Sequence, residues 1–168
     1  MQTVKIVEPI EPIKILKTQQ IRVKKGHKLY SYFDEMCFQS KNLYNVGNFH
    51  IRQCLTGFKK DAKSITPNEK EVIDLINNTI PILNTVKLDY FNKRVATESL
   101  KPVEQQKKVT LAQYDLFTEE SHYLGYELLE GIFKLNDQPD YAILPGQVNQ
   151  QVIKLLQRDW KSFFEALK

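Results

Sequence analysis

The side chains best suited to chemistry in this sequence are cations that have no acidic neighbours. No Asp or Glu occurs between Pro12 and Phe33. This window carries six positively charged residues, which are Lys14, Lys17, Arg22, Lys24, Lys25 and Lys28. Cations without a counter-charge repel one another unless an external anion lies nearby, and phosphate is the commonest such anion. The window is therefore compatible with contacts to nucleic acid, and it is equally compatible with a solvated edge strand protected by its lysines.

Two predicted helices carry further side chains that could contact phosphate or base edges. Lys41, Asn45 and Arg52 lie opposite the apolar face of residues 29–55, and Asn and Arg donate to phosphates or to bases. In residues 145–168 the cations outnumber Asp159 and Glu165. An ordinary solvated helix surface accounts for these polar residues equally well by periodicity. The predicted nucleic-acid contacts are Lys24, Lys25, Lys28, Lys41, Asn45, Arg52, Lys154, Arg158 and Lys161.

No arrangement of residues in this sequence indicates catalysis. There is no Gly-x-Ser-x-Gly, no phosphate-binding Walker loop and no Gly-x-Gly-x-x-Gly. His27, His50 and His122 are far apart, and His50 is expected to pack or to contact phosphate. Cys37 and Cys54 make no Cys-x-x-Cys pair and are predicted to be buried free thiols. We therefore expect no catalytic residue, no metal site, no cofactor, no small-molecule substrate and no enzymatic activity.

Alternating and helical patterns divide the chain into two kinds of structure. Residues 2–7, 13–16 and 19–25 are extended runs and predict strands. The period then changes to about 3.6, which predicts a helix over residues 29–55, with small Ser40 and Gly47 allowing close approach of a neighbour or a bend at the glycine. Cys37 and Cys54 belong to the apolar face of this helix.

The remaining elements are expected to be helical. Thr66-Pro67 begins a helix that Pro81 ends or kinks, and residues 83–94 form another. Residues 99–109 are expected to be a loop, a short helix begins at residues 110–113, and residues 121–134 form a helix with a buried stripe. The members of that stripe are Leu124, Leu128, Leu129, Ile132 and Phe133. After a turn over residues 136–140, a long helix starts at Pro145, and its apolar stripe is Ile153, Leu156, Trp160, Phe163 and Leu167.

Length and composition are those of one soluble globular domain with a mildly basic character. The chain has 168 residues and a formal net charge of +4. No stretch reaches the roughly 20 apolar residues of a transmembrane helix, and the first residues lack a secretory pattern. We therefore expect a cytoplasmic protein that does not interact with membranes.

Two segments resemble one known family. The string LPGQVNQQVIKLLQRDWKSFFEALK at Leu144–Lys168 closely resembles a helix of the TnpB-type proteins, also called OrfB, of the IS200/IS605 and IS1341 transposons. These are RNA-guided nucleases related to the Cas12 effectors. The string SKNLYNVGNFHIRQ at Ser40–Gln53 resembles the family's early helix, written around Ser-x-Asn-Leu-Tyr-Asn. The two segments occur in the family's order.

The resemblance implies a mainly α fold with a small β part, in three regions. Residues 1–28 would be strands of an incomplete, wedge-type β-barrel. Residues 29–135 would be a helical recognition lobe, and residues 136–168 a turn and a long basic amphipathic helix leading towards a nuclease domain of the RuvC type. The catalytic carboxylates and the four-cysteine zinc element of the family would lie beyond Lys168.

The function implied is binding of guide RNA and target DNA by part of a transposon-encoded nuclease, without the catalytic domain. Two alternatives are a truncated remnant that no longer cuts, and a helical interaction module. The module would use its stripe between Ile153 and Leu167 to dock onto a nuclease half encoded as a separate chain.

Overall fold

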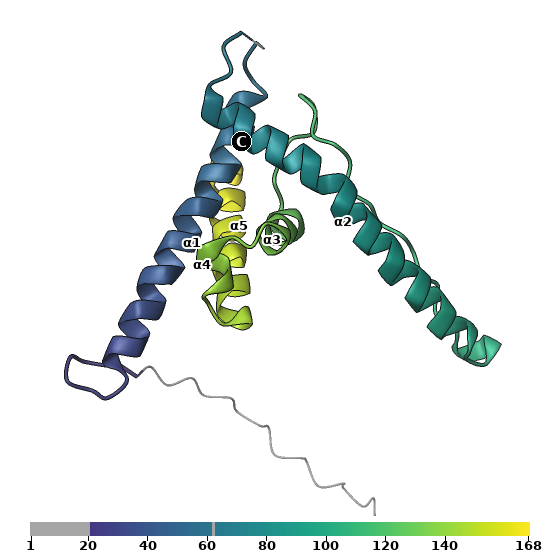
Figure 1. Ribbon diagram of the computed structural model, residues 1–168, viewed down its shortest axis with the longest axis horizontal. Helices are drawn as coiled ribbons and strands as arrows, with labels where there is room; N and C mark the ends of the chain where they lie inside the picture. Colours follow the sequence, from purple (N-terminus) through teal and green to yellow (C-terminus); the bar gives the residue numbers. More distant parts are fainter. Residues whose placement is uncertain (1–20, 62) are drawn as a thin grey trace, which may run out of the picture.

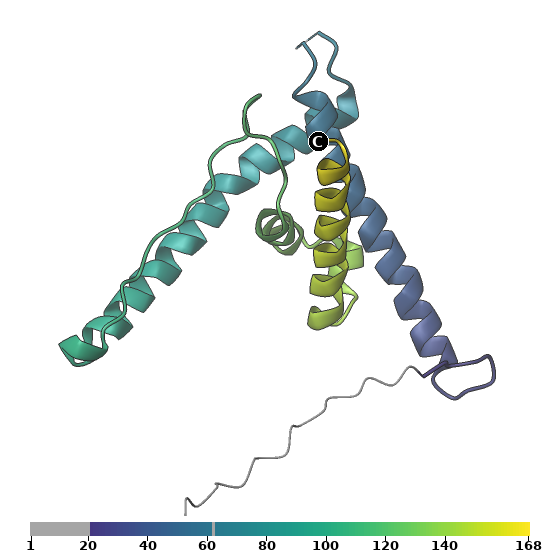
Figure 2. The same cartoon turned by 180° about the vertical axis from the view of Figure 1, so that it is seen from behind.

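The computed structural model describes residues 21–61 and 63–168, which form helices joined by turns and extended segments. The elements are α1 (Tyr30–Gly57), α2 (Pro67–Ser99), the short 3-10 helix η1 (Val103–Gln105), α3 (Tyr126–Leu135), α4 (Pro139–Ala142) and α5 (Gly146–Ala166). The two long helices α1 and α2 are the arms of a V (Figure 1). Helix α5 lies along α1 and α3 lies between the arms, as the view from behind also shows (Figure 2).

The predicted β part is wrong for the residues that the structure describes, because residues 21–61 and 63–168 contain no strand, sheet or barrel. Residues 21–24 are irregular, and the chain then turns: the His27 amide donates to the Lys24 carbonyl at 3.1 Å, and Gly26 has a φ of 93°. A strand requires a partner strand for its backbone groups, and the described residues supply none. The strands predicted at 2–7 and 13–16, and the start of the one at 19–25, lie outside the described residues.

The hydrophobic core forms where α1, α2, α3 and α5 meet. Its fully buried members include Ile51 of α1, Ile76 of α2, Phe133 of α3 and Leu156 of α5. All five residues of the stripe predicted between Leu124 and Phe133 are buried, so that prediction is confirmed.

The apolar stripe of α5 is covered along only part of its length. Ile153 and Leu156 are buried and Trp160 is partly buried. Phe163 is 51% exposed and Leu167 is 68% exposed. The predicted helix is therefore confirmed, but the end of its stripe remains an apolar surface.

Helix α1 confirms the helix predicted over residues 29–55, and it continues through Gly47. A Cβ added at Gly47 would lie 2.6 Å from Cδ2 of Leu156, so the glycine lets α5 approach closely without a shift of the Leu156 side chain. The buried residues of α1 begin only at Leu43. Cys54 is buried as predicted, but the prediction for Cys37 is wrong: its thiol is exposed, because it lies on the part of α1 that no neighbour buries.

Helix α2 begins as predicted and ends later than predicted. The Thr66 side chain accepts from the Glu69 amide while the Glu69 carboxylate accepts from the Thr66 amide, which is a capping box. Pro81 neither ends the helix nor separates it from residues 83–94, because α2 runs on to Ser99. Ile80 is held in the core before the proline and Asn84 is hydrogen-bonded after it, so tertiary contacts on both sides offset the lost backbone bond.

Residues 106–121, which we call the strap, run in an extended form back along α2 (Figure 2). The Asn84 amide donates to the Tyr114 carbonyl and accepts from the Tyr114 amide, both at 2.8 Å. The Asn77 side chain accepts from the Phe117 amide at 3.0 Å. Because side chains of α2 satisfy these backbone groups, the short helix predicted from residue 110 does not form. The helix predicted from residue 121 begins only at Tyr126.

We predict that Glu69 makes the stability of the apex of the V depend on pH. Its buried carboxylate accepts hydrogen bonds from Lys60 Nζ at 2.7 Å, from the Thr66 amide at 2.8 Å and from Thr56 Oγ1 at 2.7 Å. These bonds, the one from Lys60 first, lower its pKa from 4.5 to about 2. A carboxyl whose pKa is lower in the folded state stabilises the fold above about pH 4.5, and this stabilisation is lost as the pH falls towards about 2.

Urea unfolding of the wild type and of Glu69→Gln over this pH range measures the effect. The variant should be less stable than the wild type near neutral pH, and the difference should shrink as the solution becomes acidic. The matched control is Glu104→Gln, which changes an exposed carboxyl of η1 and should show no such trend. A difference that stays constant from neutral to acidic pH would contradict the prediction.

Candidate nucleic-acid interface

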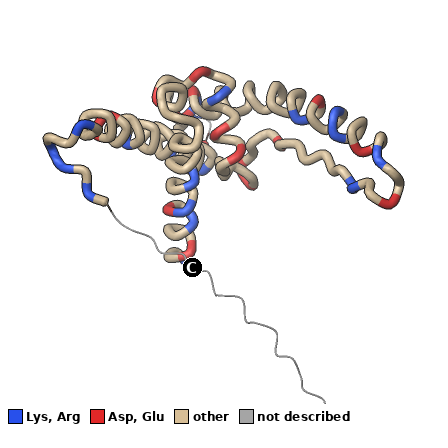
Figure 3. The backbone as a smooth tube through the Cα atoms, turned by 90° about the horizontal axis from the view of Figure 1, so that it is seen from below, with Lys and Arg blue, Asp and Glu red and all other residues tan. Residues whose placement is uncertain are grey.

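The nine side chains predicted to contact nucleic acid are all on exposed residues, and they fall into three groups. Lys24, Lys25 and Lys28 precede α1. Lys41, Asn45 and Arg52 lie on α1, and Lys154, Arg158 and Lys161 lie on α5. Figure 3 shows the basic residues of the first group at the end of α1 and those of the last group along α5. The structure thus brings each group together but keeps the first group at the open end of its arm.

The first group is positioned by the turn that leads into α1. Gly26 supplies the left-handed backbone conformation of this turn, and the His27 Nδ1 accepts from the Leu29 amide at 3.2 Å. Three lysines within five residues are thereby held beside the helix start. Within the described residues, no carboxylate forms an ion pair with Lys24, Lys25 or Lys28.

The second group occupies one side of α1. Residues 41, 45 and 52 are spaced by four and seven, so they share a helix face. Lys41 Nζ lies 4.9 Å from the centre of the Phe38 ring, a cation–π contact that leaves its charge exposed.

Tyr44 and Trp160 join α1 to α5 beside this second group. The Tyr44 hydroxyl donates to Asp159 Oδ2 at 3.0 Å, and the Trp160 Nε1 donates to Asn48 Oδ1 at 3.1 Å. Burial, and then the hydrogen bond to Asp159, raise the pKa of Tyr44. The polar ends of both rings therefore hold the two helices together.

The third group forms a basic stripe on α5, since residues 154, 158 and 161 are spaced by four and three. Lys154 Nζ lies 5.3 Å from the centre of the Tyr126 ring. Arg158 Nε is 4.0 Å from Asp159 Oδ1, at the limit of an ion pair, and both residues are exposed. Among the described residues no carboxylate pairs with Lys161, so the stripe keeps a positive charge.

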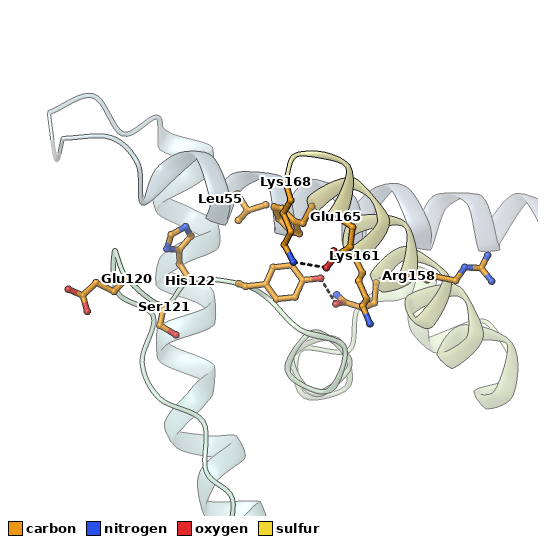
Figure 4. A pocket seen from close by; sticks show the side chains of 11 residues that line it. Leu55, Glu120, Ser121, His122, Arg158, Lys161, Glu165 and Lys168 are labelled. Atoms are coloured by element: carbon orange, nitrogen blue, oxygen red, sulfur yellow. Dashed lines mark hydrogen bonds and ion pairs between the residues drawn. The ribbon is translucent and has the colours of Figure 1, made fainter.

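A hollow of about 750 Å³ lies between the last turns of α5 and residues 120–123 (Figure 4). Arg158 and Lys161 contribute to its lining, together with Tyr123 and Phe164. The sequence analysis missed Tyr123 as a site residue, because residues 121–125 were expected to be helical. The signal available in the sequence was a tyrosine directly after His122.

The histidines have structural partners and do not form a cluster. His50 is partly buried, its Nδ1 is 2.8 Å from the Val46 carbonyl oxygen, and its ring meets the edge of Phe133 at 5.3 Å. Burial lowers the pKa of His50. The ring of His122 stacks on Phe58 at 5.3 Å. Over residues 21–61 and 63–168, no group of three or more His, Cys, Asp or Glu residues could hold a metal ion.

What the described surface offers chemically is groups of exposed cations. The absence of enzymatic activity stays a prediction. None of the helices formed by the described residues is both long and apolar enough to span a bilayer.

Comparison with known proteins adds no relative: no family model, no curated protein and no solved structure matches this chain. The resemblance to the TnpB-type proteins therefore stays a hypothesis.

Proposed function

We propose that this chain binds RNA and DNA through three basic groups, which lie before α1, on α1 and on α5. In the TnpB-type family it would correspond to the region that holds guide RNA and target DNA, without the catalytic domain. The observation that supports the proposal most directly is that all nine predicted contact residues are exposed and that the eight cations among them have no strong ion-pair partner among the described residues. Uncompensated cations grouped on a surface attract a polyanion.

The spacing of the groups suits an extended ligand. From Tyr30 to Arg52 the axis of α1 advances by about 33 Å, which is the length of about ten base pairs of duplex. The lysines before α1 and the residues near Arg52 would then contact phosphates about one helical turn apart. An elongated nucleic acid lying along α1 could therefore engage both groups at once.

A second candidate function has its own supporting observation. Phe163 of α5 and Leu167, which directly follows this helix, are exposed, and this supports docking onto another protein such as a separately encoded nuclease half. Ile153 and Leu156 are already buried in the core of this chain, so the docking surface would be restricted to the end of the predicted stripe. Protein docking of this kind should be insensitive to the basic groups.

We predict that Lys154→Gln, Arg158→Gln and Lys161→Gln together weaken nucleic-acid binding and its salt dependence. Each lost phosphate contact lowers the slope of log affinity against log salt by about 0.7 to 0.9, so three contacts lower it by about 2 to 3. Fluorescence anisotropy with a labelled RNA hairpin and a labelled DNA duplex, over a range of salt concentrations, measures both quantities. Reversing Lys24, Lys25 and Lys28 to Glu should have a similar or larger effect.

The matched control removes the same number of charges elsewhere. Lys93, Lys107 and Lys108 are exposed residues of α2 and the strap, and changing them to Gln should leave the slope nearly unchanged. An equal loss in the control would mean that net charge alone acts. Wild-type protein that is folded by circular dichroism, yet binds neither RNA nor DNA and co-purifies with no RNA, would overturn the proposed function.

A further inference from the structure

The hollow beside α5 combines an aromatic wall with cations in one concave site. Tyr123 is 42% exposed, and its hydroxyl donates to Gln157 Oε1 at 2.7 Å. The Gln157 amide donates in turn to the Leu124 carbonyl at 3.0 Å. The Tyr123 ring also meets the Phe164 ring edge-on, with centres 5.6 Å apart. The tyrosine is therefore fixed in place while part of its ring remains accessible.

Positive charge lies next to this ring. Lys161 is one helical turn after Gln157, the residue that holds Tyr123, so it lies on the same side of α5. Lys168 also lines the hollow and pairs with Glu165 at 2.9 Å, which neutralises that carboxylate. Figure 4 shows Glu120 and Arg158 on opposite sides of the labelled residues, with both side chains extending outward. Lys161 is therefore the cation best placed to serve a ligand on Tyr123.

The size and the chemistry of the hollow fit one nucleotide. Its volume of about 750 Å³ lies within the usual range for small-molecule sites, about 300 to 1,000 Å³. An acidic peptide would use the cations but would gain little from a fixed aromatic ring. A nucleotide uses both, because its base stacks on the ring and its phosphate meets the cation. A paired base has both faces covered, so the ligand must be unpaired.

We propose that this hollow takes a single unpaired nucleotide, with its base against Tyr123 and its phosphate beside Lys161. The inference deepens the proposed function and rests on it, since it assigns the unpaired part of the nucleic acid to this side of α5. The same chemistry could come from a nucleotide within a strand or from a free mononucleotide.

The test measures binding of a labelled, single-stranded oligoadenylate to the full chain. Tyr123→Leu should weaken it by about tenfold, the usual effect of losing one stacked base, and Lys161→Gln should lower the salt slope by about 0.7. Tyr123→Phe keeps the ring and its edge contact with Phe164, so it should lose much less affinity than Tyr123→Leu. Tyr90→Leu changes a tyrosine of α2 that is 64% exposed and should have no effect.

Two further ligands, blunt duplex DNA and adenosine monophosphate, show whether the hollow requires an unpaired base and whether it takes a free nucleotide or one within a strand. Blunt duplex DNA should bind the wild type and Tyr123→Leu equally. Competition by adenosine monophosphate at concentrations comparable to the oligonucleotide would support the hollow as a site for free mononucleotides. Failure to compete, with the Tyr123 effect intact, would support a strand-borne nucleotide.

Unchanged oligoadenylate binding by Tyr123→Leu, with binding still lost in the α5 triple variant, would overturn the hollow and leave the proposed function standing. A wild type that binds neither oligonucleotide nor duplex would overturn the proposed function. In that case the hollow is tested by itself, by titrating the protein with adenosine monophosphate and recording the fluorescence of Trp160. The Trp160 ring can report on the hollow because its centre is 5.6 Å from that of Phe164, which lines the hollow. Unchanged fluorescence would overturn it as well.

Discussion

Replacing Phe133 with alanine is expected to lower the free energy of unfolding by about 3 to 5 kcal/mol. Phe133 is 2% exposed and lies at the centre of the core, where its ring contacts His50 at 5.3 Å and Tyr141 at 6.3 Å between ring centres. Removing the ring loses its burial and leaves a cavity between α1, α3 and α4. The free energy of unfolding of a native protein is only about 5 to 15 kcal/mol, so this loss is a large fraction of the total stability.

Urea unfolding monitored by circular dichroism measures this loss. The pKa of His50 gives a second readout, because it is lowered by burial and should rise towards its ordinary value if water enters the space left by Phe133. Phe38→Ala, which changes an exposed phenylalanine of α1, should cost no more than about 0.5 kcal/mol. Equal stabilities of Phe133→Ala and the wild type would mean that α3 does not pack between the arms.

Gly47→Leu is expected to lower the free energy of unfolding by about 2 kcal/mol. Forcing extra methylenes into a packed contact costs up to about 3 kcal/mol, and replacing glycine within a helix returns about 1 kcal/mol. A Cβ added at this position would lie 2.6 Å from Leu156 Cδ2 and 3.4 Å from Leu129 Cδ2, so the rest of a leucine side chain has no room. The two helices must move apart, or the new side chain must expose the core.

A graded series distinguishes packing from helix propensity. Gly47→Ala should be close to neutral, because the nearest atom is the end of a leucine side chain that can shift slightly. Gly146→Leu is the matched control, since a Cβ there would meet nothing within 4 Å. Thermal unfolding of the three variants measures the effect, and a Gly47→Leu protein as stable as Gly146→Leu would show that α5 does not approach α1 as described.

Much of the helical structure follows from local sequence patterns. Apolar residues at spacings of three and four located α1, α5 and the buried stripe of α3, and Thr66 with Pro67 and Glu69 located the start of α2. These signals are strong because they depend only on residues within a few helical turns. The exposure of Lys41, Asn45 and Arg52 agrees with their positions opposite the apolar face predicted for residues 29–55.

The errors arose where distant parts of the chain determine the local conformation. Pro81 lies in a continuous helix because residues on both sides of it are held by tertiary contacts, which no local window contains. Cys37 is exposed because neighbours bury α1 only from Leu43 onwards. The hollow depends on Tyr123 meeting Gln157 and Phe164, residues more than thirty positions later in the chain. Neither the grouping of site residues nor their distances could be read from composition.

The hydrogen bonds between α2 and the strap set a constraint on chain length. Asn77 and Asn84 are seven residues apart on a helix, which is about 10.5 Å, and their partners Phe117 and Tyr114 are three residues apart in an extended chain, which is about 10 Å. The two spacings agree only in this alignment. Substitutions at residues 115 and 116 should therefore be tolerated, whereas insertion or deletion of one residue there would leave one asparagine without its backbone partner.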